Sequence, residues 1–287
     1  MPEQIPQPTE AGQTAGYIFS EPLKQAVEIA CVLGKPLLVK GPPGCGKTGL
    51  AQAIATERKL PIYKWFVKST SRAQDGLYSI DVVRRLQDAH LGKEQAQTLN
   101  PYLRFGALGD AIRSGQECVV LIDEIDKADI DFPNDLLREL DEMKFTVDEI
   151  GYLHEYSTTK RPIVVITSND EKELPDAFLR RCTFFYIDFP EGENLERIVL
   201  ANLAGTAVDR TLVANAAKTI LRYRRVKELR KLPATSELID WVRILMHWGI
   251  TADQLKADAP LGEAPFWKVL FKYREDQNRV EEASATK

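Results

Sequence analysis

Residues 36–48 read PLLVKGPPGCGKT, which combines a short apolar strand, a glycine-rich turn and the start of a helix. The turn matches the pattern G-x-x-x-x-G-K-[ST] at every fixed position. Its glycines let the backbone curl so that successive N–H groups point at a phosphate chain, and the following helix adds the positive end of its dipole. The pattern predicts a phosphate-binding loop formed by Gly41, Pro42, Pro43, Gly44, Cys45, Gly46, Lys47 and Thr48.

Two side chains of this loop are predicted to contact the ligand directly. Lys47 would place its charge on the β- and γ-phosphates, and Thr48 would offer its hydroxyl to Mg²⁺. The alternative is a loop whose lysine is merely solvated. The context favours the functional interpretation, because Leu50 and Ile54 follow one turn apart, as in a helix packed on a sheet.

A pair of carboxylates follows a second apolar strand. Residues 118–122 are all apolar, which is typical of a strand buried on both faces, and Asp123 and Glu124 come directly after them. Ligands of open parallel sheets bind at this end of the strands. Asp123 is therefore predicted to reach Mg²⁺, and Glu124 to orient and deprotonate the attacking water. A solvated strand end is the alternative, and the phosphate loop upstream disfavours it.

Three further strands are predicted at residues 62–67, 162–169 and 183–187. The second of these ends at Asn169, which is placed to hold the water opposite the γ-phosphate, although an asparagine that simply forms a turn is the alternative. The strand at 62–67 lies in sequence between the phosphate-loop strand and the Asp-Glu strand. Sequence order leaves open whether it also lies between them in the sheet.

Two arginines end the short helix that begins at Pro175. Arg180 and Arg181 could complement the dipole of that helix, or one of them could serve as an arginine finger on the γ-phosphate of a neighbouring subunit. Near the start of the chain, Tyr17 and Ile18 precede a helix that leads to the phosphate loop. They could therefore lie against a nucleotide base.

The pattern of the chain changes after Pro190, where strands are replaced by helices predicted over 194–203, 208–228 and 236–248. The expected organisation is an α/β nucleotide-binding core with a small all-α domain behind it. Its boundaries are a flexible segment 1–13, a core 14–189, a helical domain 190–252 and a helical tail 253–287, whose last helix is expected around 266–273.

The composition of the chain disfavours several classes of function. The chain has 287 residues, a formal net charge of −4 and a pI of about 5.6, so no global basic field attracts nucleic acid or anionic lipid. Its four cysteines are far apart, which disfavours a disulfide framework or a zinc knuckle and is typical of reduced thiols in the cytoplasm. No apolar run approaches the length of a membrane span.

These motifs together resemble those of the AAA+ ATPases and, within them, the MoxR-like branch. The resemblance covers about residues 14–250 and rests on Gly41–Thr48 as Walker A, Leu121–Glu124 as Walker B, Thr167–Asn169 as sensor 1 and Leu179–Arg181 as the finger region. It implies a P-loop NTPase three-layer sandwich with a parallel five-stranded sheet and a helical lid. The stretch 69–117 resembles the helical insert of this branch, and 144–160 its hairpin before sensor 1.

The resemblance also implies a function. Members of the branch bind ATP and Mg²⁺ between subunits of a homo-oligomeric ring, often of six, and remodel or activate partner proteins, many of which carry a von Willebrand A domain. Arg181 matches the family's finger position better than Arg180. One departure is clear: the family often has a lid arginine, sensor 2, where this chain has Pro233–Glu237. Arg230, Lys231 or Arg243 could substitute, so no residue is assigned to that role.

Other functions remain compatible with a phosphate loop. A nucleic-acid machine of the clamp-loader or restriction-translocase type is disfavoured by the acidic pI. A P-loop kinase acting on a small molecule is disfavoured by the Asp-Glu pair, the two arginines and the lid. A nucleotide sensor that does not hydrolyse is disfavoured because Lys47, Asp123, Glu124 and Asn169 are all present.

Overall fold

The computed structural model describes residues 17–149 and 152–285. The expected flexible segment at 1–13 and the expected hairpin turn at Ile150 and Gly151 lie outside these residues. The described chain forms two compact units. The first contains residues 19–41 and 47–187, and the second contains residues 17–18, 42–46 and 188–285.

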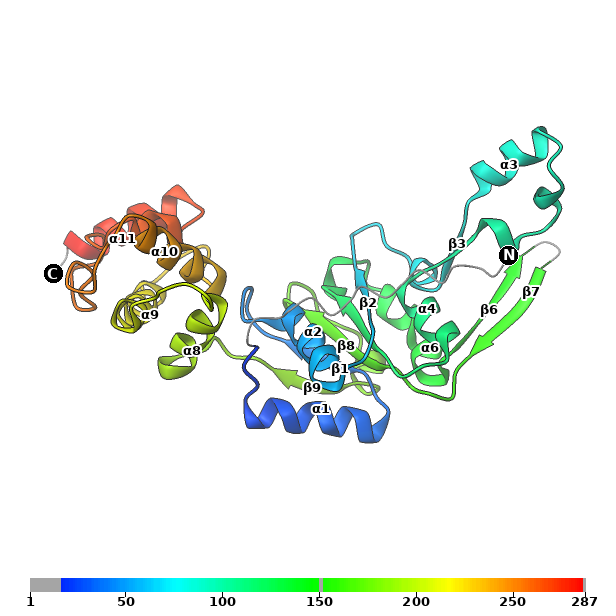
Figure 1. The fold of residues 1–287 in the computed structure, drawn as a ribbon, viewed down its shortest axis with the longest axis horizontal. Helices are drawn as coiled ribbons and strands as arrows, with labels where there is room; N and C mark the ends of the chain where they lie inside the picture. The colour runs from blue at the N-terminus through cyan, green and yellow to red at the C-terminus, as the bar shows by residue number, and fades with distance from the viewer. Residues whose placement is uncertain (1–16, 150–151, 286–287) are drawn as a thin grey trace. The chain divides into compact units, whose positions relative to one another are not determined.

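The first unit is built on a five-stranded parallel sheet, as predicted (Figure 1). Its strands lie in the order β2-β5-β8-β1-β9, and their bounds are β1 (Leu37–Lys40), β2 (Ile62–Phe66), β5 (Val119–Asp123), β8 (Ile163–Ser168) and β9 (Thr183–Tyr186). The phosphate-loop strand β1 and the Asp-Glu strand β5 are not neighbours. The strand between them is β8, while β2 lies at the edge of the sheet.

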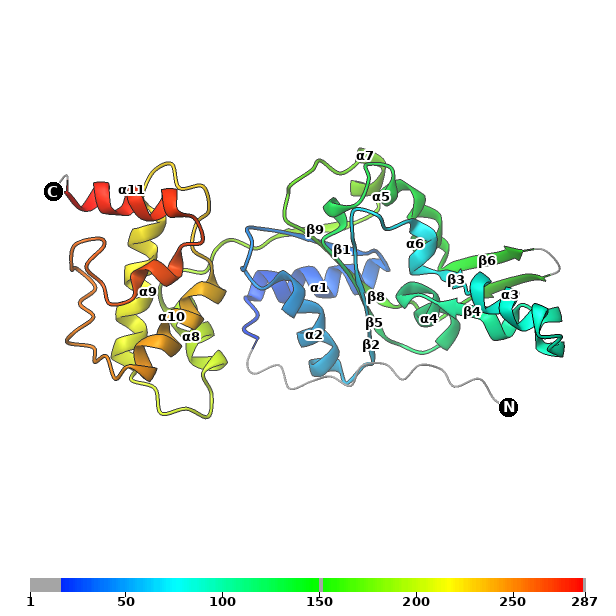
Figure 2. The same cartoon turned by 90° about the horizontal axis from the view of Figure 1, so that it is seen from above.

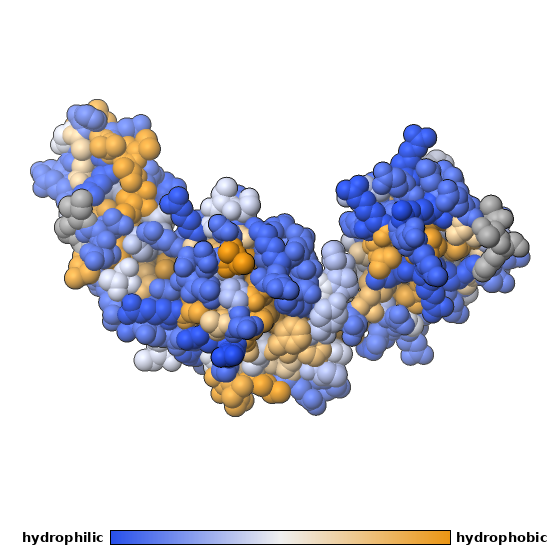
Figure 3. Space-filling model, turned by 180° about the vertical axis from the view of Figure 1, so that it is seen from behind, coloured by the Kyte–Doolittle hydropathy of each residue, from blue (hydrophilic) through white to orange (hydrophobic). Residues whose placement is uncertain are grey.

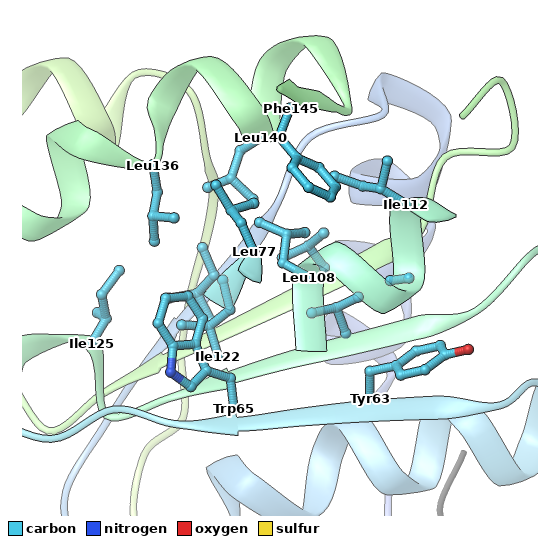
Figure 4. Close-up of a cluster of buried hydrophobic side chains, with 14 of the residues drawn as sticks. Tyr63, Trp65, Leu77, Leu108, Ile112, Ile122, Ile125, Leu136, Leu140 and Phe145 are labelled. Atoms are coloured by element: carbon cyan, nitrogen blue, oxygen red, sulfur yellow. The ribbon is translucent and has the colours of Figure 1, made fainter. Parts of the chain in front are cut away.

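Helices cover both faces of this sheet (Figure 2). They are α1 (Glu21–Leu33), α2 (Lys47–Arg58), α4 (Ala107–Ser114), α5 (Phe132–Asp135), α6 (Leu137–Glu142) and α7 (Asp176–Leu179). Figure 4 shows Trp65 and Ile122 turned toward Leu108 of α4 and Leu136, with α2 on the opposite side of the strands. This burial on both faces explains why β5 consists of apolar residues up to Asp123.

Helix α1 shows how the sequence sets the boundaries of an element. The Ser20 hydroxyl accepts the N–H of Leu23 at 3.3 Å, and Pro22 occupies the first turn. The helix ends at Gly34, whose φ of 61° is left-handed and favours glycine. Capped at both ends, α1 buries Leu23, Val27 and Ala30 at helical spacing beside β1 and β9.

Two antiparallel pairs of strands extend from the first unit. Strand β3 (Tyr78–Ile80) pairs with β4 (Leu103–Phe105), and α3 (Val82–His90) lies between them in sequence. Strands β6 (Lys144–Glu149) and β7 (Tyr152–Ser157) form the second pair. Short 3-10 turns complete this unit at Ala73–Gly76, Glu94–Gln97, Asn100–Tyr102 and Ile125–Lys127.

The second unit is helical, as predicted for the region after Pro190. Its helices are α8 (Gly192–Asn202), α9 (Arg210–Arg224), α10 (Thr235–His247) and α11 (Arg274–Ala285). The tail packs into the same apolar cluster as α8, α9 and α10, through residues that include Leu255, Trp267, Leu270, Phe271 and Val280. In the described part of the chain, no helix combines the length and the apolar character that crossing a membrane requires.

The expectation of a last helix over 266–273 is wrong. A 3-10 turn, Trp267–Leu270, occupies that stretch, and the helix begins at Arg274 and continues to Ala285. The aromatic residues of this stretch fill the apolar cluster from a turn and not from a helix. The true helix is mostly polar and buries Val280, so it lacks the apolar spacing by which a helix is recognised.

Candidate active site

The phosphate loop has the backbone that its sequence predicts. Gly44 and Gly46 have φ angles of 75° and 96°, which side chains disfavour. Lys47 begins α2 and is 6% exposed, and its Nζ donates to the carbonyl oxygen of Gly41 at 2.7 Å. The lysine is thus folded back along the loop, with its ammonium group beside the backbone that would surround a phosphate.

The side chains of Thr48 and Asp123 meet at the carboxyl-terminal edge of the sheet. The Thr48 hydroxyl donates to the Asp123 carboxylate, with distances of 2.9 Å to Oδ1 and 3.2 Å to Oδ2. Asp123 is the last residue of β5 and is 6% exposed. The structure therefore brings together the two residues that were predicted to hold a metal ion.

Thr167 connects this pair to Glu124. Its hydroxyl donates to Asp123 Oδ1 at 2.7 Å and accepts the backbone N–H of Glu124 at 2.8 Å. Thr167 lies on β8, the strand between β1 and β5, and is fully buried. One hydroxyl therefore fixes both acidic residues relative to the central strand.

The Glu124 carboxylate is held by two donors. Asn169 Nδ2 donates to Oε1 at 2.9 Å, and Lys127 Nζ donates to Oε2. The hydrogen bond to Glu124 raises the pKa of Lys127. Glu124 has a φ of 58°, which is uncommon for a residue with a side chain and turns the chain sharply after β5. The structure thus brings Glu124 and Asn169 into contact.

Asp126 positions the segment that carries Asn169. It is 2% exposed, and its Oδ2 accepts the backbone N–H groups of Asn169 and Glu171, both at 3.0 Å. Because the backbone of Asn169 is tied to the turn that follows β5, the two strand ends are locked together. Asp126 therefore positions Asn169 relative to Glu124.

Arg180 and Arg181 lie away from these residues. They precede β9, so they are at the amino-terminal edge of the sheet, whereas Asp123 ends β5 at the opposite edge. Arg181 Nε contacts Asp141 Oδ2 at 2.6 Å, and its Nη1 donates to Ala177 O at 3.1 Å. Arg180 is exposed. The structure does not bring either arginine to the site formed by its own chain.

Tyr17 lies against the phosphate loop within the second unit. A Cβ placed on Gly46 would be 3.4 Å from a ring carbon of Tyr17. Burial, and to a smaller extent the Cys45 thiol, raise the pKa of Tyr17 above its ordinary value. Ile18 is half-buried beside it in sequence. Tyr17 is thus placed beside the phosphate loop, and a contact with a nucleotide base stays a prediction for both residues.

The candidates for a lid cation all have partners within the second unit. The Arg230 guanidinium lies 4.2 Å from the ring centroid of Tyr273, Lys231 is 3.4 Å from Glu237, and Arg243 is 3.5 Å from Asp240. Each of these contacts gives the cation a structural role within the second unit. The sensor 2 position therefore stays unassigned.

Sequence reasoning missed the roles of three residues: Thr167, Asp126 and Lys127. Lys127 could have been found, because it follows Glu124 by three residues in a turn. Asp126 follows the conspicuous carboxylate pair and is easily taken for a solvated residue. Thr167 belongs to the motif Thr167–Asn169, but only the sheet order, with β8 beside β5, places its hydroxyl between the two carboxylate residues.

Comparison with known proteins identifies the family. Residues 37–189 match the model of the ATPase family associated with various cellular activities, AAA. The chain belongs to the AAA family. It is therefore an ATPase, and the matched AAA domain contains Thr48, Asp123, Glu124, Asn169 and Arg181.

Relatives of this AAA protein differ in length. The denitrification regulatory protein NirQ of Stutzerimonas stutzeri is 30% identical over 273 residues, which cover 86% of each chain. The ribosome biogenesis ATPase RIX7 of Saccharomyces cerevisiae is 27% identical over 52% of this chain and 15% of its own length. The chaperone protein ClpB of Lactiplantibacillus plantarum is 32% identical over 47% of this chain and 14% of its own. The chain thus spans most of NirQ and a small part of the other two.

The AAA family implies ATP and Mg²⁺, and the residues fit both. A hydroxyl and a carboxylate, Thr48 and Asp123, converge as oxygen donors of the kind that Mg²⁺ prefers. Among the described residues, no group of three or more His, Cys, Asp or Glu side chains could hold a metal ion alone. The pair of Thr48 and Asp123 suits Mg²⁺, which usually takes one or two protein ligands together with phosphate oxygens and water.

Proposed function

We propose that this AAA protein is a MoxR-like ATPase that assembles into a homo-oligomeric ring, hydrolyses ATP between subunits and uses the energy to remodel or activate a partner protein. The observation that carries the proposal is the position of the two arginines. Arg180 and Arg181 precede β9 at one edge of the sheet, while Asp123 and Glu124 follow β5 at the other. To act on a γ-phosphate, Arg180 or Arg181 therefore has to come from a second copy of the chain.

Each residue of the site has a proposed role in hydrolysis. Mg²⁺ bound with ATP would neutralise phosphate charge, with Thr48 and Asp123 as its protein contacts. Lys47 binds the β- and γ-phosphates from the loop. Glu124 takes a proton from the attacking water, and Asn169 holds that water in line. Each Glu124 oxygen already accepts one hydrogen bond, and the second lone pair of each oxygen can accept a proton of the water.

The comparisons and one surface support a protein partner. NirQ is named as a regulatory protein and ClpB as a chaperone. Helix α3 also exposes Val82, Val83 and Leu86, each more than half accessible, while its buried side is polar. Apolar side chains gather over the segment that carries α3 (Figure 3). An exposed apolar helix suits contact with another protein, and a von Willebrand A domain protein is the partner proposed.

The proposed location is the cytoplasm. Cys31, Cys118 and Cys182 have free thiols, and burial raises the pKa of Cys118 and Cys182 to about 12. Both thiols therefore stay protonated and poorly nucleophilic at neutral pH. Reduced, unreactive thiols suit a reducing compartment.

The proposed roles of Lys47 and Glu124 in ATP binding and hydrolysis are tested with two site variants and a control. Lys47→Ala is expected to lose nucleotide binding. Glu124→Gln is expected to retain ATP but to hydrolyse it about a hundredfold more slowly, because the general base is gone. Glu155→Gln, which changes an exposed carboxylate of β7, serves as the matched control. Unchanged turnover in Glu124→Gln would contradict the assignment.

The subunit arrangement is tested by mass and by mixing. The mass of the assembly is measured with and without ATP, and wild type is then mixed with Arg180→Ala or Arg181→Ala in varied proportions. A finger that acts on a neighbour makes activity depend on how variant and wild-type copies are arranged. Activity that falls in simple proportion to the variant's share, for both arginines, would contradict action between subunits.

A further inference from the structure

A cavity of about 560 Å³ lies at the amino-terminal edge of the sheet. Lys35 precedes β1, Leu60 precedes β2, and Pro162 precedes β8, so the cavity is on the opposite edge from Asp123. Its other lining residues include Cys118, immediately before β5. Pockets for small ligands typically enclose about 300–1,000 Å³. No role proposed above for the nucleotide site uses this cavity.

The lining of this cavity is basic, although the whole chain is acidic. Four cations line it: Lys35, Arg58, Lys160 and Arg161. The carboxylates that face them are Glu117, in the lining, and Glu28, whose Oε1 pairs with Arg58. Positive charge therefore exceeds negative charge within this cavity, against a net charge of −4 for the chain.

The thiols of the cavity do not offset this positive charge. Burial raises the pKa of Cys118 to about 12, and burial also raises the pKa of Cys31. Both thiols are therefore neutral at physiological pH. The cavity combines neutral thiols with an excess of cations in its lining, which is an arrangement that favours an anion.

Arg161 is built into the cavity by the backbone around it. Its guanidinium donates to the carbonyl oxygens of Gly34 at 2.8 Å and Leu140 at 3.1 Å, and also to that of Asp141. A Cβ on Gly34 would be 3.0 Å from Arg161 Cδ, so a glycine allows this close approach. Carbonyl groups orient the guanidinium without neutralising it, so its charge remains available to a ligand.

From this size and charge we infer that the cavity is a second ligand site, which binds a small phosphorylated metabolite. Phosphate oxygens are the acceptors that arginine binds best, often through two parallel hydrogen bonds. Lys35 and Lys160 are exposed, and their flexible ammonium groups can turn to a second anionic group on the same ligand. The site is distinct from the phosphate loop, which lies at the other edge of the sheet.

The same cations hold the segment that contains the candidate finger. Lys35 Nζ donates to the carbonyl oxygen of Arg180 at 3.3 Å. Arg161 donates to the backbone of Asp141, whose carboxylate pairs with Arg181. A ligand that draws Lys35 away from Arg180 would loosen this segment. An effect on hydrolysis rests on the function proposed above, whereas binding itself does not.

Binding is tested with inorganic pyrophosphate as the probe, by calorimetric titration of the Lys47→Ala protein, in which the phosphate loop lacks its cation. In that background, Lys35→Met with Lys160→Met removes two cations from the cavity. Lys24→Met with Lys272→Met removes the same charge from exposed positions outside it. The cavity variant is expected to bind pyrophosphate at least about tenfold more weakly, as befits the loss of charge-assisted hydrogen bonds.

Two results would overturn the inference. One is equal pyrophosphate affinity in the cavity variant and the control variant, which would place the probe elsewhere. The other is no saturable binding up to about 10 mM in the Lys47→Ala protein. These titrations contain no ATP and use a protein that is expected not to bind it. If pyrophosphate does not bind, the proposed ATPase mechanism is therefore unaffected. If the ATPase mechanism is wrong, the titrations still test the cavity.

The link to the finger segment is tested by amide hydrogen exchange in the same proteins. Pyrophosphate is expected to speed exchange at residues 180–182 in Lys47→Ala, because the Lys35 tether to Arg180 is released. The variant that also carries Lys35→Met and Lys160→Met should show no such response. An equal response in both proteins, or none in either, would refute the link.

Discussion

The hydroxyl group of Thr167 holds two acidic residues, Asp123 and Glu124, in position. Its hydroxyl is both the donor to Asp123 and the acceptor for the backbone N–H of Glu124, at 2.7 and 2.8 Å. A hydroxyl can do both at once because it has one proton and two lone pairs. No apolar residue of the same shape could replace it without leaving a buried N–H unpaired.

Thr167→Val therefore tests whether the site depends on this hydroxyl. Valine keeps the branched shape but loses both hydrogen bonds, and an unpaired buried donor costs about 1–3 kcal/mol. We expect ATP turnover to fall at least about tenfold, with nucleotide affinity changed much less. The measurement is steady-state hydrolysis together with nucleotide titration.

Thr183→Val is the matched control, because its hydroxyl also bonds within the sheet, to Pro36 O at 3.1 Å, but lies at the other edge. Equal turnover in the two variants would show that Thr167 has no special role. A fall in both nucleotide affinity and turnover would instead indicate a general loss of structure.

Much of the site could be predicted from sequence, because its residues lie at strand ends. The loop Gly41–Thr48 and the pair Asp123 and Glu124 are local patterns, and the structure brings Thr48 to Asp123 and Asn169 to Glu124. The role of Thr167 could not be predicted, since it depends on which strands are neighbours. Sequence gives strand order along the chain, and the sheet order is set by long-range packing.

Among the elements, α3 has its polar and apolar sides reversed. Its buried residue is Asp88, which is 5% exposed and accepts hydrogen bonds from Lys93, Gln95 and Tyr102 at 2.6–2.9 Å. Helices of soluble proteins usually bury an apolar stripe and expose a polar one. This polar network therefore holds α3 in place while its apolar side faces outward.

The network makes the position of α3 sensitive to acid. The hydrogen bond from Lys93 lowers the pKa of Asp88 to about 2, helped by Gln95 and Tyr102. A carboxyl whose pKa is lower in the folded state stabilises the fold above its unfolded value of about 3.9, and this contribution is lost as the pH falls toward 2. We expect the protection of amides in residues 82–102, relative to their intrinsic exchange rates, to fall over that range.

Asp88→Asn supplies the comparison for this pH effect. Its amide cannot be protonated in that range, so exchange in residues 82–102 should be faster at neutral pH and should respond less to acid. The β6–β7 hairpin, measured in the same spectra, reports any general unfolding. If wild type and Asp88→Asn show the same pH dependence, Asp88 does not hold α3.

On the scale of the whole molecule, the second unit is a single core to which the tail contributes. Tyr223 of α9 stacks with Trp267 at 5.9 Å between ring centroids, and Trp241 of α10 donates to Pro265 O at 2.8 Å. Asp276 is fully buried and accepts the backbone N–H of Arg230 at 2.7 Å. The tail is therefore part of the folded helical unit.

Trp267→Ala should destabilise this unit strongly. Trp267 is 5% exposed, and truncation of a buried aromatic side chain usually costs about 3–5 kcal/mol. Trp248 is 65% exposed, so Trp248→Ala should change the free energy of unfolding by no more than about 0.5 kcal/mol. Urea denaturation, followed by the fluorescence of the remaining tryptophans, compares the two. Similar midpoints would show that the tail contributes little to the core.

The division into an α/β unit and a helical unit could be predicted, because strand patterns stop near Pro190. The contribution of the tail to the core was harder to predict. Its buried residues lie in turns and single positions, such as Leu255 and Val280, and such positions have no periodicity that sequence reasoning can detect. Asp276 looks like an ordinary acidic residue at the start of a helix until its partners are known.

The pairing of β3 with β4 has a practical consequence. Ile80 is paired with Leu103, and the backbone N–H of Asp81 donates to Tyr102 O at 2.9 Å. The two ends of the segment between β3 and β4 are therefore adjacent. Residues 82–101 can therefore be exchanged as a cassette. A two-residue Asn-Gly turn would close the stem as an ordinary hairpin. Such a shortened protein would separate the contribution of α3 from that of the nucleotide site.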